Sequence, residues 1–313
     1  MDPIRVVFLG NDPWSVLPME ALAGSSLELS LVVTRTARPA GRGSVLRRTA
    51  VAEAAAGRHL PLLEIDSVRD EAGLEAIRAA APDVLAVVAY GEILPPPVLE
   101  LAPLGAVNLH FSLLPRWRGA SPVRRAIWEG DETTGVTTIL LDEGLDTGPI
   151  LLQQEDGIRA EDDAGSLGER LAAIGAPVLV RAIQGLADGS IEAEPQDQVL
   201  ATHAPKLTKQ DRRLVWSREA GYVVRQVRAL SPEPGASAVF RGDTLKVFSA
   251  RAEGWAGETR APGEVVESGE EGVLVSAGIG AVRLLFVAQA GRRRMTAAEF
   301  VRGARIVAGE RFG

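Results

Sequence analysis

The chain is organised around the segment Val107-Asn108-Leu109-His110-Phe111-Ser112-Leu113-Leu114-Pro115-Arg116-Trp117-Arg118-Gly119. Its first half alternates apolar and polar residues, so a strand there sends Asn108, His110 and Ser112 to one face. In a packed core each of these polar groups would need its own hydrogen-bond partner, or it would cost about 1 to 3 kcal/mol. We therefore predict a strand whose carboxyl end opens onto a cavity lined by these three side chains.

A structural role is the alternative interpretation for His110, because a lone histidine on a strand is more often an ordinary hydrogen-bonded residue than a catalyst. Asn108 and Ser112 lie on the same face of the predicted strand, and a Leu-Leu-Pro loop follows at once. Together these features favour a functional site.

The composition indicates a soluble protein of two domains. The chain has 313 residues, of which 46% are hydrophobic, enough for a core in each domain. The absence of cysteine excludes disulfides and thiolate metal sites, and three histidines are too few for a histidine-rich metal site. The apolar run at residues 4–9 is too short for a signal-peptide core or a membrane span. We expect a cytoplasmic monomer with no metal ion and no membrane partner.

Strand-like runs, at residues 4–10 and 27–33 for example, alternate with helical patterns. This alternation predicts an α/β fold with a doubly wound, Rossmann-like parallel sheet that binds ligands at the carboxyl ends of its strands. Residues 90–95 and 108–115 follow two such ends and should face each other across one crevice. The first turn, Gly10-Asn11-Asp12-Pro13, lacks the G-x-G-x-x-G pattern, and no G-x-x-x-x-G-K-[ST] occurs, which makes NAD and ATP poor candidates.

A second candidate segment is the loop at residues 142–149, which follows another predicted strand. Acidic residues in such loops are often turn formers. At the carboxyl end of a strand, however, a carboxylate from Asp142 or Asp146 can approach His110. Asn108, His110 and an aspartate form a proton-transfer set, since the carboxylate takes a proton while the other two stabilise negative charge on oxygen.

Basic residues gather in two places. Arg38, Arg42, Arg47 and Arg48 belong to a glycine-containing loop, and a cationic loop of this kind can reach phosphates. From Lys209 onward the chain has 17 Lys and Arg against 12 Asp and Glu, although the net charge of the whole chain is −7. This asymmetry indicates a polyanionic partner, with a merely solvated basic surface as the alternative.

The composition and the predicted secondary structure of the chain change after residue 189. We predict a catalytic domain at residues 1–189 and a polar, proline-containing linker at residues 190–208. Residues 209–313 contain one helical pattern and then short β-prone runs separated by glycine-containing turns. This pattern predicts a small C-terminal β-barrel that is OB-like, the architecture of oligonucleotide-binding domains.

The chain resembles the methionyl-tRNA formyltransferases over essentially its whole length. The motifs that carry the resemblance are Arg38-Pro-Ala-Gly-Arg-Gly43, Val88-Ala89-Tyr90-Gly91, Ile93-Leu94-Pro95, Asn108-x-His110-x-Ser112-Leu-Leu-Pro-Arg-Trp-Arg-Gly-Ala120, Gly144-Leu-Asp146-Thr-Gly148, Ala187-Asp-Gly189, Lys206-Leu207, Pro234-Gly-Ala236 and Gln289-Ala-Gly291. The motifs around His110 and Asp146 are specific to folate-dependent formyl transfer as a group. The arginine-rich loop and the basic C-terminal region point to tRNA as the acceptor.

The resemblance implies an enzyme that moves a formyl group from 10-formyltetrahydrofolate to the amino group of methionine on initiator tRNA, in translation initiation. It makes Asn108, His110 and Asp146 the catalytic residues. Asn108 and a protonated His110 would stabilise the tetrahedral oxyanion, while Asp146 would keep the imidazole charged and take the amine proton. The folate is expected to contact Tyr90, Ile93, Leu94, Ser112, Leu113, Leu114, Pro115 and Asp142, and the tRNA is expected to contact Arg38, Arg42, Arg47 and Arg48.

Two departures from the family pattern bear on these expectations. The family often has Gly-Thr-Pro after the first strand, where this chain has Gly10-Asn11-Asp12-Pro13. The loop after residue 43 often carries lysines, whereas this chain supplies Arg47 and Arg48 a little later. We therefore expect the acceptor-stem contacts to be redistributed among Arg42, Arg47 and Arg48.

Other functions stay open on the sequence alone. A folate-dependent formyltransferase that acts on an amino-sugar nucleotide, or an enzyme that hydrolyses the folate, would carry the same motifs. A non-catalytic RNA-binding module on the same fold is a further alternative, although such a module has no need of Asn108, His110 and Asp146.

Overall fold

The computed structural model describes residues 3–40, 45–255, 257 and 260–313. The chain divides into two units. The first comprises residues 1–122, 133–157 and 168–205, and the second comprises residues 123–132, 158–167 and 206–313.

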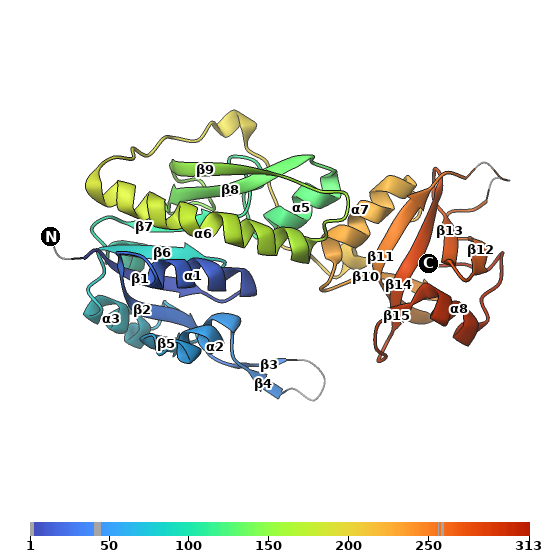
Figure 1. Cartoon of the computed structure of the whole chain (residues 1–313), viewed down its shortest axis with the longest axis horizontal. Coiled ribbons are helices and arrows are strands. Elements are labelled where there is room, and N and C mark those ends of the chain that lie inside the picture. Colours follow the sequence, from blue (N-terminus) through green and yellow to red (C-terminus); the bar gives the residue numbers. More distant parts are fainter. Residues whose placement is uncertain (1–2, 41–44, 256, 258–259) are drawn as a thin grey trace. The chain divides into compact units, whose positions relative to one another are not determined.

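A mixed sheet forms the centre of the first unit (Figure 1). Its strands lie in the order β5 (Leu62–Ile65), β2 (Glu28–Arg35), β1 (Arg5–Gly10), β6 (Val84–Val88), β7 (Ala106–His110), β8 (Thr133–Leu140) and β9 (Ile150–Gly157). The strands from β5 to β7 are parallel, which confirms the predicted doubly wound sheet. A wholly parallel sheet is a wrong expectation, however, because β8 runs antiparallel to β7 and β9 runs antiparallel to β8.

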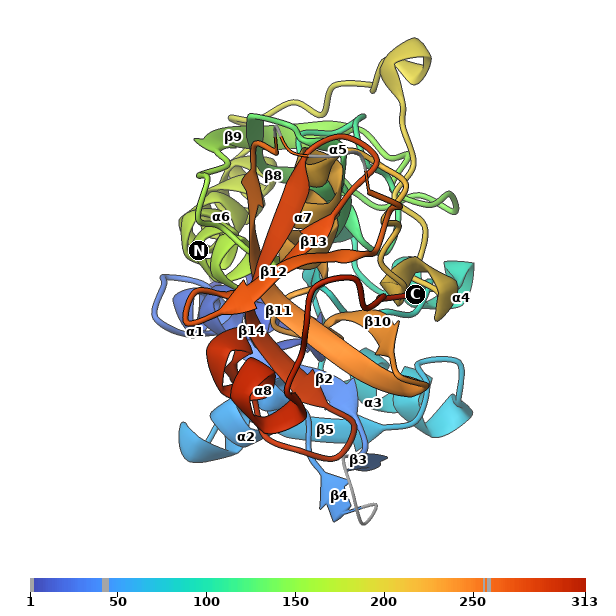
Figure 2. The same ribbon diagram turned by 90° about the vertical axis from the view of Figure 1, so that its right-hand side faces the viewer.

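Helices cover both faces of this sheet. Figures 1 and 2 place α1 (Val16–Ala23) and α6 (Ala164–Asp188) on one face, and α3 (Glu71–Ala79) and α4 (Pro96–Leu99) on the other. The remaining helical segments of this unit are α2 (Ala50–Gly57), η1 (Pro13–Ser15) and η2 (Gln198–Leu200). The face of the sheet that packs on α6 is therefore distinct from the face that packs on α3 and α4.

Helix α6 is long and apolar enough to cross a membrane by length and composition, but half of its apolar window is buried inside the structure. A Cβ atom at its Gly175 would lie 2.8 Å from Leu109 Cδ2, so the missing side chain lets β7 approach closely. This contact identifies α6 as a core helix of the first unit.

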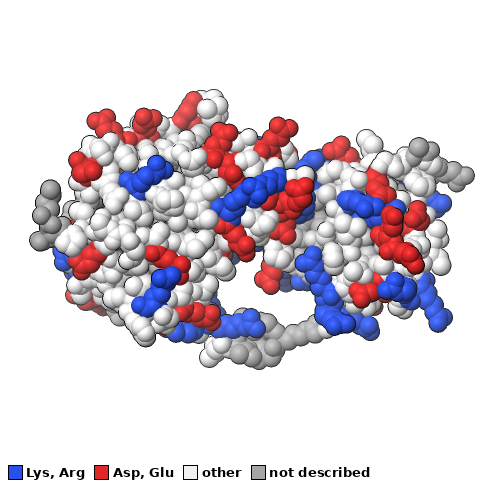
Figure 3. Space-filling model, in the orientation of Figure 1, with Lys and Arg blue, Asp and Glu red and all other residues white. Residues whose placement is uncertain are grey.

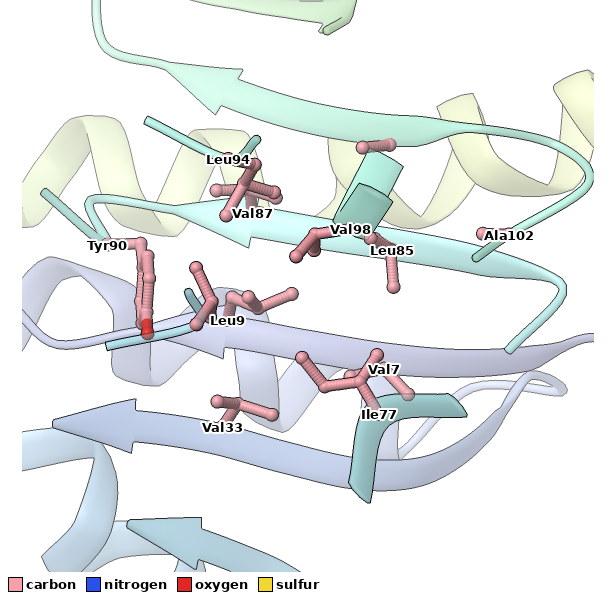
Figure 4. Close-up of a cluster of buried hydrophobic side chains, with 12 residues drawn as sticks. Val7, Leu9, Val33, Ile77, Leu85, Val87, Tyr90, Leu94, Val98 and Ala102 are labelled. Atoms are coloured by element: carbon pink, nitrogen blue, oxygen red, sulfur yellow. The ribbon is translucent and has the colours of Figure 1, made fainter. Parts of the chain in front are cut away.

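A buried apolar cluster fills the space between the sheet and the helices α3 and α4 (Figure 4). Val7, Leu9 and Val33 extend from the strands and meet Ile77 of α3 and Val98 of α4. Burying each side chain of this size contributes about 1.5 to 3 kcal/mol relative to exposure. The cluster fixes the carboxyl ends of β1, β2 and β6, from which the loops of the site emerge.

A two-stranded hairpin projects from the chain after β2. It consists of β3 (Arg38–Ala40) and β4 (Val45–Arg47) in antiparallel register. The sequence predicted a loop here and not strands.

An antiparallel sheet curls into a barrel in the second unit. Its order is β10 (Ala236–Phe240), β11 (Asp243–Glu253), β14 (Ala281–Gln289), β13 (Gly272–Ser276) and β12 (Val265–Gly269), and β15 (Met295–Thr296) pairs with β14. The C-terminal residues close the seam, because Phe312 pairs with Phe240 and Arg311 pairs with Glu264. The predicted OB-like barrel is thereby confirmed. The helical segments of this unit are α5 (Pro122–Glu129), η3 (Gln210–Arg212), α7 (Ala220–Leu230) and α8 (Ala297–Ala304).

Candidate active site

Strand β7 presents His110 at its carboxyl end. Because Leu109 faces Gly175 of α6, strand alternation sends Asn108 and His110 to the opposite face of the sheet. His110 Nε2 lies 2.9 Å from the carbonyl oxygen of Trp117. A carbonyl oxygen only accepts hydrogen bonds, so Nε2 carries a hydrogen and donates it. Nδ1 is therefore the ring nitrogen left for a second partner.

The carboxylate of Asp146 faces that nitrogen. Its Oδ2 lies 3.6 Å from His110 Nδ1 and accepts a 2.7 Å hydrogen bond from the backbone N–H of Gly119. The side chains of His110 and Asp146 are only 6% and 13% exposed, so their interaction is stronger than it would be in water. Asp146 also has a φ of 55°, a left-handed conformation that costs a non-glycine residue about 1 to 3 kcal/mol and is found preferentially at functional sites.

The loop that carries Asp146 reaches His110 by a route that the sequence did not predict. We expected the loop to leave β8 beside the carboxyl end of β7, as in a parallel sheet. In the antiparallel register Leu140 is instead opposite Val107, at the start of β7, while His110 is opposite Thr137. The loop must therefore fold back along β7 to bring its carboxylate to the imidazole.

Asn108 lies two residues before His110, on the same face of β7. It is 9% exposed, and among the residues that the structure describes its side-chain amide has no hydrogen-bond partner. The backbone of Asn108 is held in register with Val87 of β6 and Ile139 of β8. The strand thus fixes an amide that can donate a hydrogen bond to a bound group.

The Leu-Leu-Pro loop after β7 is stabilised by two hydrogen bonds with the side chain of Thr137. The Thr137 hydroxyl donates to the carbonyl of Ser112 at 2.6 Å and accepts from the N–H of Leu114 at 3.0 Å. Gln153 of β9 donates to the carbonyl of Leu114 at 2.8 Å. Leu114 is buried, whereas Leu113 and Pro115 are half-buried. Strands β8 and β9 therefore serve as a platform for this loop.

Ser112 is fully buried, and its hydroxyl donates to the carbonyl of Arg116 at 2.6 Å. The hydroxyl closes the turn that leads to Trp117. This is a local bond within the loop. By fixing Arg116 it also orients the next residue, Trp117, whose carbonyl accepts the hydrogen bond from His110.

The segment after β6 divides its side chains between the core and the surface. Tyr90 and Leu94 belong to the buried cluster of Figure 4, whereas Ile93 is 55% exposed. Burial raises the pKa of Tyr90 to about 12. Its buried hydroxyl has no hydrogen-bond partner within the described residues. Of these three predicted folate contacts, Ile93 presents the most side-chain surface.

Asn11 in the unusual first turn ties three strand ends together. Its amide nitrogen donates to the carbonyl of Tyr90 after β6. Its amide oxygen accepts from the Thr34 hydroxyl at 2.9 Å and from the backbone N–H of Arg35 at 2.8 Å, both in β2. The departure from Gly-Thr-Pro thus supplies a structural cross-link, a role that no local sequence signal indicated.

Asp142 is exposed, and its Oδ1 accepts from the Gly144 N–H at 3.0 Å and from the Thr147 hydroxyl at 2.7 Å. These bonds stabilise the loop that carries Asp146. The structure therefore places Asp142 as a turn-forming residue of this loop, while only Asp146 approaches His110.

Two of the predicted tRNA contacts lie opposite each other on the β3–β4 hairpin. Arg38 pairs with Arg47 in the register, and both side chains are exposed. Figure 3 shows Lys and Arg side chains over this hairpin. Arg48 instead forms a bidentate ion pair with Glu64, in which Nε lies 3.1 Å from Oε1 and Nη2 lies 2.6 Å from Oε2. These hydrogen bonds raise the pKa of Arg48. Arg42 lies outside the described residues.

Like charges directly opposite across two strands destabilise the pairing. The hairpin therefore holds Arg38 and Arg47 together at a cost that a bound anion would remove. No group of three or more His, Asp and Glu side chains within the described ranges is placed to hold a metal ion.

Comparison with known proteins gives matches over both units. The model of the formyl transferase family matches residues 4–183, and the model of the formyl transferase C-terminal domain matches residues 206–305. A protein of Aromatoleum aromaticum named methionyl-tRNA formyltransferase is 42% identical over 99% of this chain and 97% of its own length. A protein of the same name from Pseudomonas paraeruginosa is 44% identical over 90% of each chain.

The fold also occurs in a solved structure. HypX from Aquifex aeolicus aligns with a TM-score of 0.68 and 20% identity over 99% of this chain and 49% of that chain. Both family models and the near full-length relatives point to the same group of proteins. The chain belongs to the formyltransferase family, among the methionyl-tRNA formyltransferases.

Proposed function

We propose that this protein transfers a formyl group from 10-formyltetrahydrofolate to the α-amino group of methionine on initiator methionyl-tRNA, and so supports translation initiation. The observation that carries the proposal is the 42% identity to a methionyl-tRNA formyltransferase over 99% of the chain, which includes both units. The match across the C-terminal unit favours tRNA over an amino-sugar nucleotide as acceptor, and the match of residues 4–183 to the formyl transferase model disfavours a non-catalytic module.

The site residues fit a nucleophilic acyl substitution. The methionine amine attacks the formyl carbon, a carbon–nitrogen bond forms, and the bond to N10 of the folate breaks after a tetrahedral oxyanion. Asn108 extends from the same face as His110, and its amide has no hydrogen-bond partner among the described residues, so it is free to donate a hydrogen bond to that oxyanion. A donor preorganised in this way contributes about 2.7 to 4 kcal/mol to transition-state stability.

His110 and Asp146 handle the proton in this proposal. Because His110 Nε2 is engaged by Trp117, the exchange takes place on the Nδ1 side, where Asp146 lies 3.6 Å away. Asp146 accepts the proton that the attacking amine loses, directly or through water, and the protonated imidazole stabilises the oxyanion. Asp146 then passes this proton, directly or through water, to N10 of the departing tetrahydrofolate, so that the carboxylate is regenerated and the new N-formyl amide on the tRNA is neutral.

The folate is proposed to lie along Ser112, Leu113, Leu114 and Pro115, between Tyr90, Ile93 and Leu94 and the loop that contains Asp142. The half-buried Leu113 and Pro115 and the exposed Ile93 offer apolar surface to an aromatic pterin. The tRNA is proposed to contact Arg38, Arg42 and Arg47 through its phosphates, and Arg48 joins them only by leaving Glu64. We also propose that the protein acts as a cytoplasmic monomer, which sedimentation of the purified protein would test.

The deciding experiment offers initiator and elongator methionyl-tRNA in parallel to the purified protein with labelled 10-formyltetrahydrofolate, and follows the label into acid-precipitable RNA. We expect label on the initiator tRNA alone. Consumption of the folate without labelled RNA would refute the tRNA assignment and leave a small amine or water as acceptor. An absence of any folate turnover would refute the enzyme assignment.

A further inference from the structure

Gln196 contacts the backbone of the loop that carries Asp146. Its side-chain nitrogen donates to the carbonyl of Asp146 at 2.9 Å and to the carbonyl of Gly148 at 2.7 Å. Gln196 is only 7% exposed, so these bonds form away from competing water. Both hydrogens of one amide group thus hold the two residues that flank Thr147.

Arg118 fixes the orientation of that amide. Its Nε and Nη2 atoms donate to Gln196 Oε1 at 3.0 and 2.6 Å, and its Nη1 donates to Gln198 Oε1 at 2.7 Å. A guanidinium group only donates and carbonyl oxygens only accept, so a single orientation of the Gln196 amide satisfies all of these partners. Bonds that involve a charged donor are also about twice as strong as neutral ones.

The main chain at Arg118 is fixed as well. Its N–H donates to the carbonyl of Thr202 at 2.8 Å, and its carbonyl accepts from the N–H of Ala204 at 2.7 Å. The neighbours of Arg118 in the sequence are the two residues that hold the site, since Trp117 accepts from His110 and Gly119 donates to Asp146. One short segment therefore positions the imidazole and the carboxylate at the same time.

We propose that Gln196, oriented by Arg118, is a positioning residue that sets the distance between the Asp146 carboxylate and the His110 imidazole during formyl transfer. The inference rests on the proposed function, because it assigns Gln196 to that same proton-transfer step. Asp146 has a left-handed backbone, which is uncommon for a residue other than glycine. The hydrogen bonds from Gln196 hold the two loop carbonyls that directly follow this left-handed backbone, those of Asp146 and Gly148, and their loss lets the carboxylate move away from Nδ1.

The test compares Gln196→Glu with the wild type. Glutamate keeps an oxygen for Arg118, which preserves the buried contact, but it has no hydrogen to donate to the carbonyls of Asp146 and Gly148. A displacement of reacting groups by about 1 Å costs about a hundredfold in rate. We expect kcat for formylation to fall about tenfold to a hundredfold, while KM for the folate and for the tRNA stays within about threefold, because the variant displaces the carboxylate and leaves the binding surfaces in place.

Gln198→Ala is the matched control. Gln198 also accepts a hydrogen bond from Arg118, but it is exposed and makes no hydrogen bond to the Asp146 loop in the described structure. We expect its kcat to stay within about twofold of the wild-type value. If Gln196→Glu fails to fold, Arg118→Lys replaces it, because lysine keeps the charge and loses the two-pronged grip on Gln196, and kcat should again fall with KM unchanged.

The outcomes separate this inference from the proposed function. A wild-type protein that forms no formylmethionyl-tRNA refutes the function. The positioning role alone is refuted if the wild type forms formylmethionyl-tRNA and the Gln196→Glu variant has an unchanged kcat. It is also refuted if the variant differs from the wild type only in KM. An equal loss of kcat in Gln198→Ala would also overturn it, since a general disturbance around Arg118 would then account for the effect.

Discussion

The Nε2 atom of His110 donates a 2.9 Å hydrogen bond to the carbonyl oxygen of Trp117, seven residues further along the chain. This bond fixes the ring plane and leaves Nδ1 toward Asp146, at 3.6 Å from the carboxylate. Trp117 itself has a φ of 65°, so the carbonyl that receives the bond comes from a left-handed turn. The geometry therefore leaves Nδ1 as the side of the imidazole on which the proposed proton exchange would take place.

Replacing Asp146 by asparagine should nearly abolish formyl transfer. The amide keeps the size of the side chain and an oxygen for the Gly119 N–H, but it cannot take the amine proton. General-base groups typically contribute about 10² to 10⁴ in rate, so we expect kcat to fall by that factor. Single-turnover formylation measures the loss, and His110→Ala should show a similar one. Retained binding of methionyl-tRNA in a filter assay is the control, and a variant that transfers normally but no longer binds RNA would reverse our assignment of roles.

Charge reversal on the hairpin should affect RNA binding and protein stability in opposite directions. Arg38→Glu places an acidic side chain opposite Arg47, a pairing worth about 0.2 to 1 kcal/mol to the free hairpin. The same change removes the phosphate contact that we propose for Arg38, so tRNA affinity should drop and the slope of log K against log salt should become shallower by about one. Affinity measured at several salt concentrations tests this. Arg78→Glu, at a 55% exposed site on α3, is the matched control and should leave the slope unchanged.

Tyr90 should make the protein sensitive to alkali. Burial raises the pKa of its phenol from 10 to about 12, so the folded state holds the proton more tightly than the unfolded state. The associated stability is fully present below pH 10 and is lost as the pH rises toward 12, by up to about 2 to 3 kcal/mol. Urea unfolding between pH 9 and 11.5 measures this slope. Tyr90→Phe should remove it, and because the hydroxyl has no partner in the described structure, the variant should be as stable as the wild type at pH 8. A wild-type slope that persists in the variant would contradict the prediction.

The barrel should lose stability in acid through Glu253. Hydrogen bonds from Arg283, at 2.6 and 2.9 Å, are the main cause that holds the pKa of Glu253 at about 2, below its usual 4.5. The folded pKa is the lower one, so this stability is present above pH 4.5 and is lost as the pH falls toward 2, by about 1 kcal/mol because solvent screens the partly exposed pair. Calorimetry of wild type and Glu253→Gln should show a difference in melting temperature at pH 7 that narrows below pH 4. A difference that is constant with pH would contradict the assignment.

The sequence predicts the strand of the site because its signal is local. Alternation places Asn108 and His110 on one face whatever surrounds them, and the structure has β7 there with both residues on that face. The edge strand β5 was not predicted, since Leu62–Ile65 is short and has no alternation, and only its parallel pairing with β2 defines it. Likewise, the proximity of Asp146 to His110 was expected on the basis of a parallel sheet, but an antiparallel β8 and a loop that folds back produce it.

Gln196 shows why part of the site could not be predicted. Its partners Asp146 and Arg118 lie 50 and 78 residues away in the sequence, and Gln196 stands in a polar segment that the sequence indicates only as a linker. Nothing in the neighbouring residues distinguishes a glutamine that faces solvent from one that holds a catalytic loop. The proposed boundaries at residues 189 and 208 stay predictions. Within that segment Thr202 and Ala204 form backbone hydrogen bonds with Arg118, and Glu194 forms them with Ile150 of β9.

The order in which the ribosome synthesises the chain determines when this arrangement can form. Domains emerge from the ribosome and fold from the N-terminus onward. The last strand of the first sheet ends at Gly157, whereas Gln196 and the residues that grip Arg118 are made only after the whole of α6. A nascent chain can therefore complete its sheet well before the Asp146 loop is secured. An enzyme that prepares the first amino acid of new proteins would itself remain inactive until the ribosome had translated past Ala204, the last residue that bonds to Arg118.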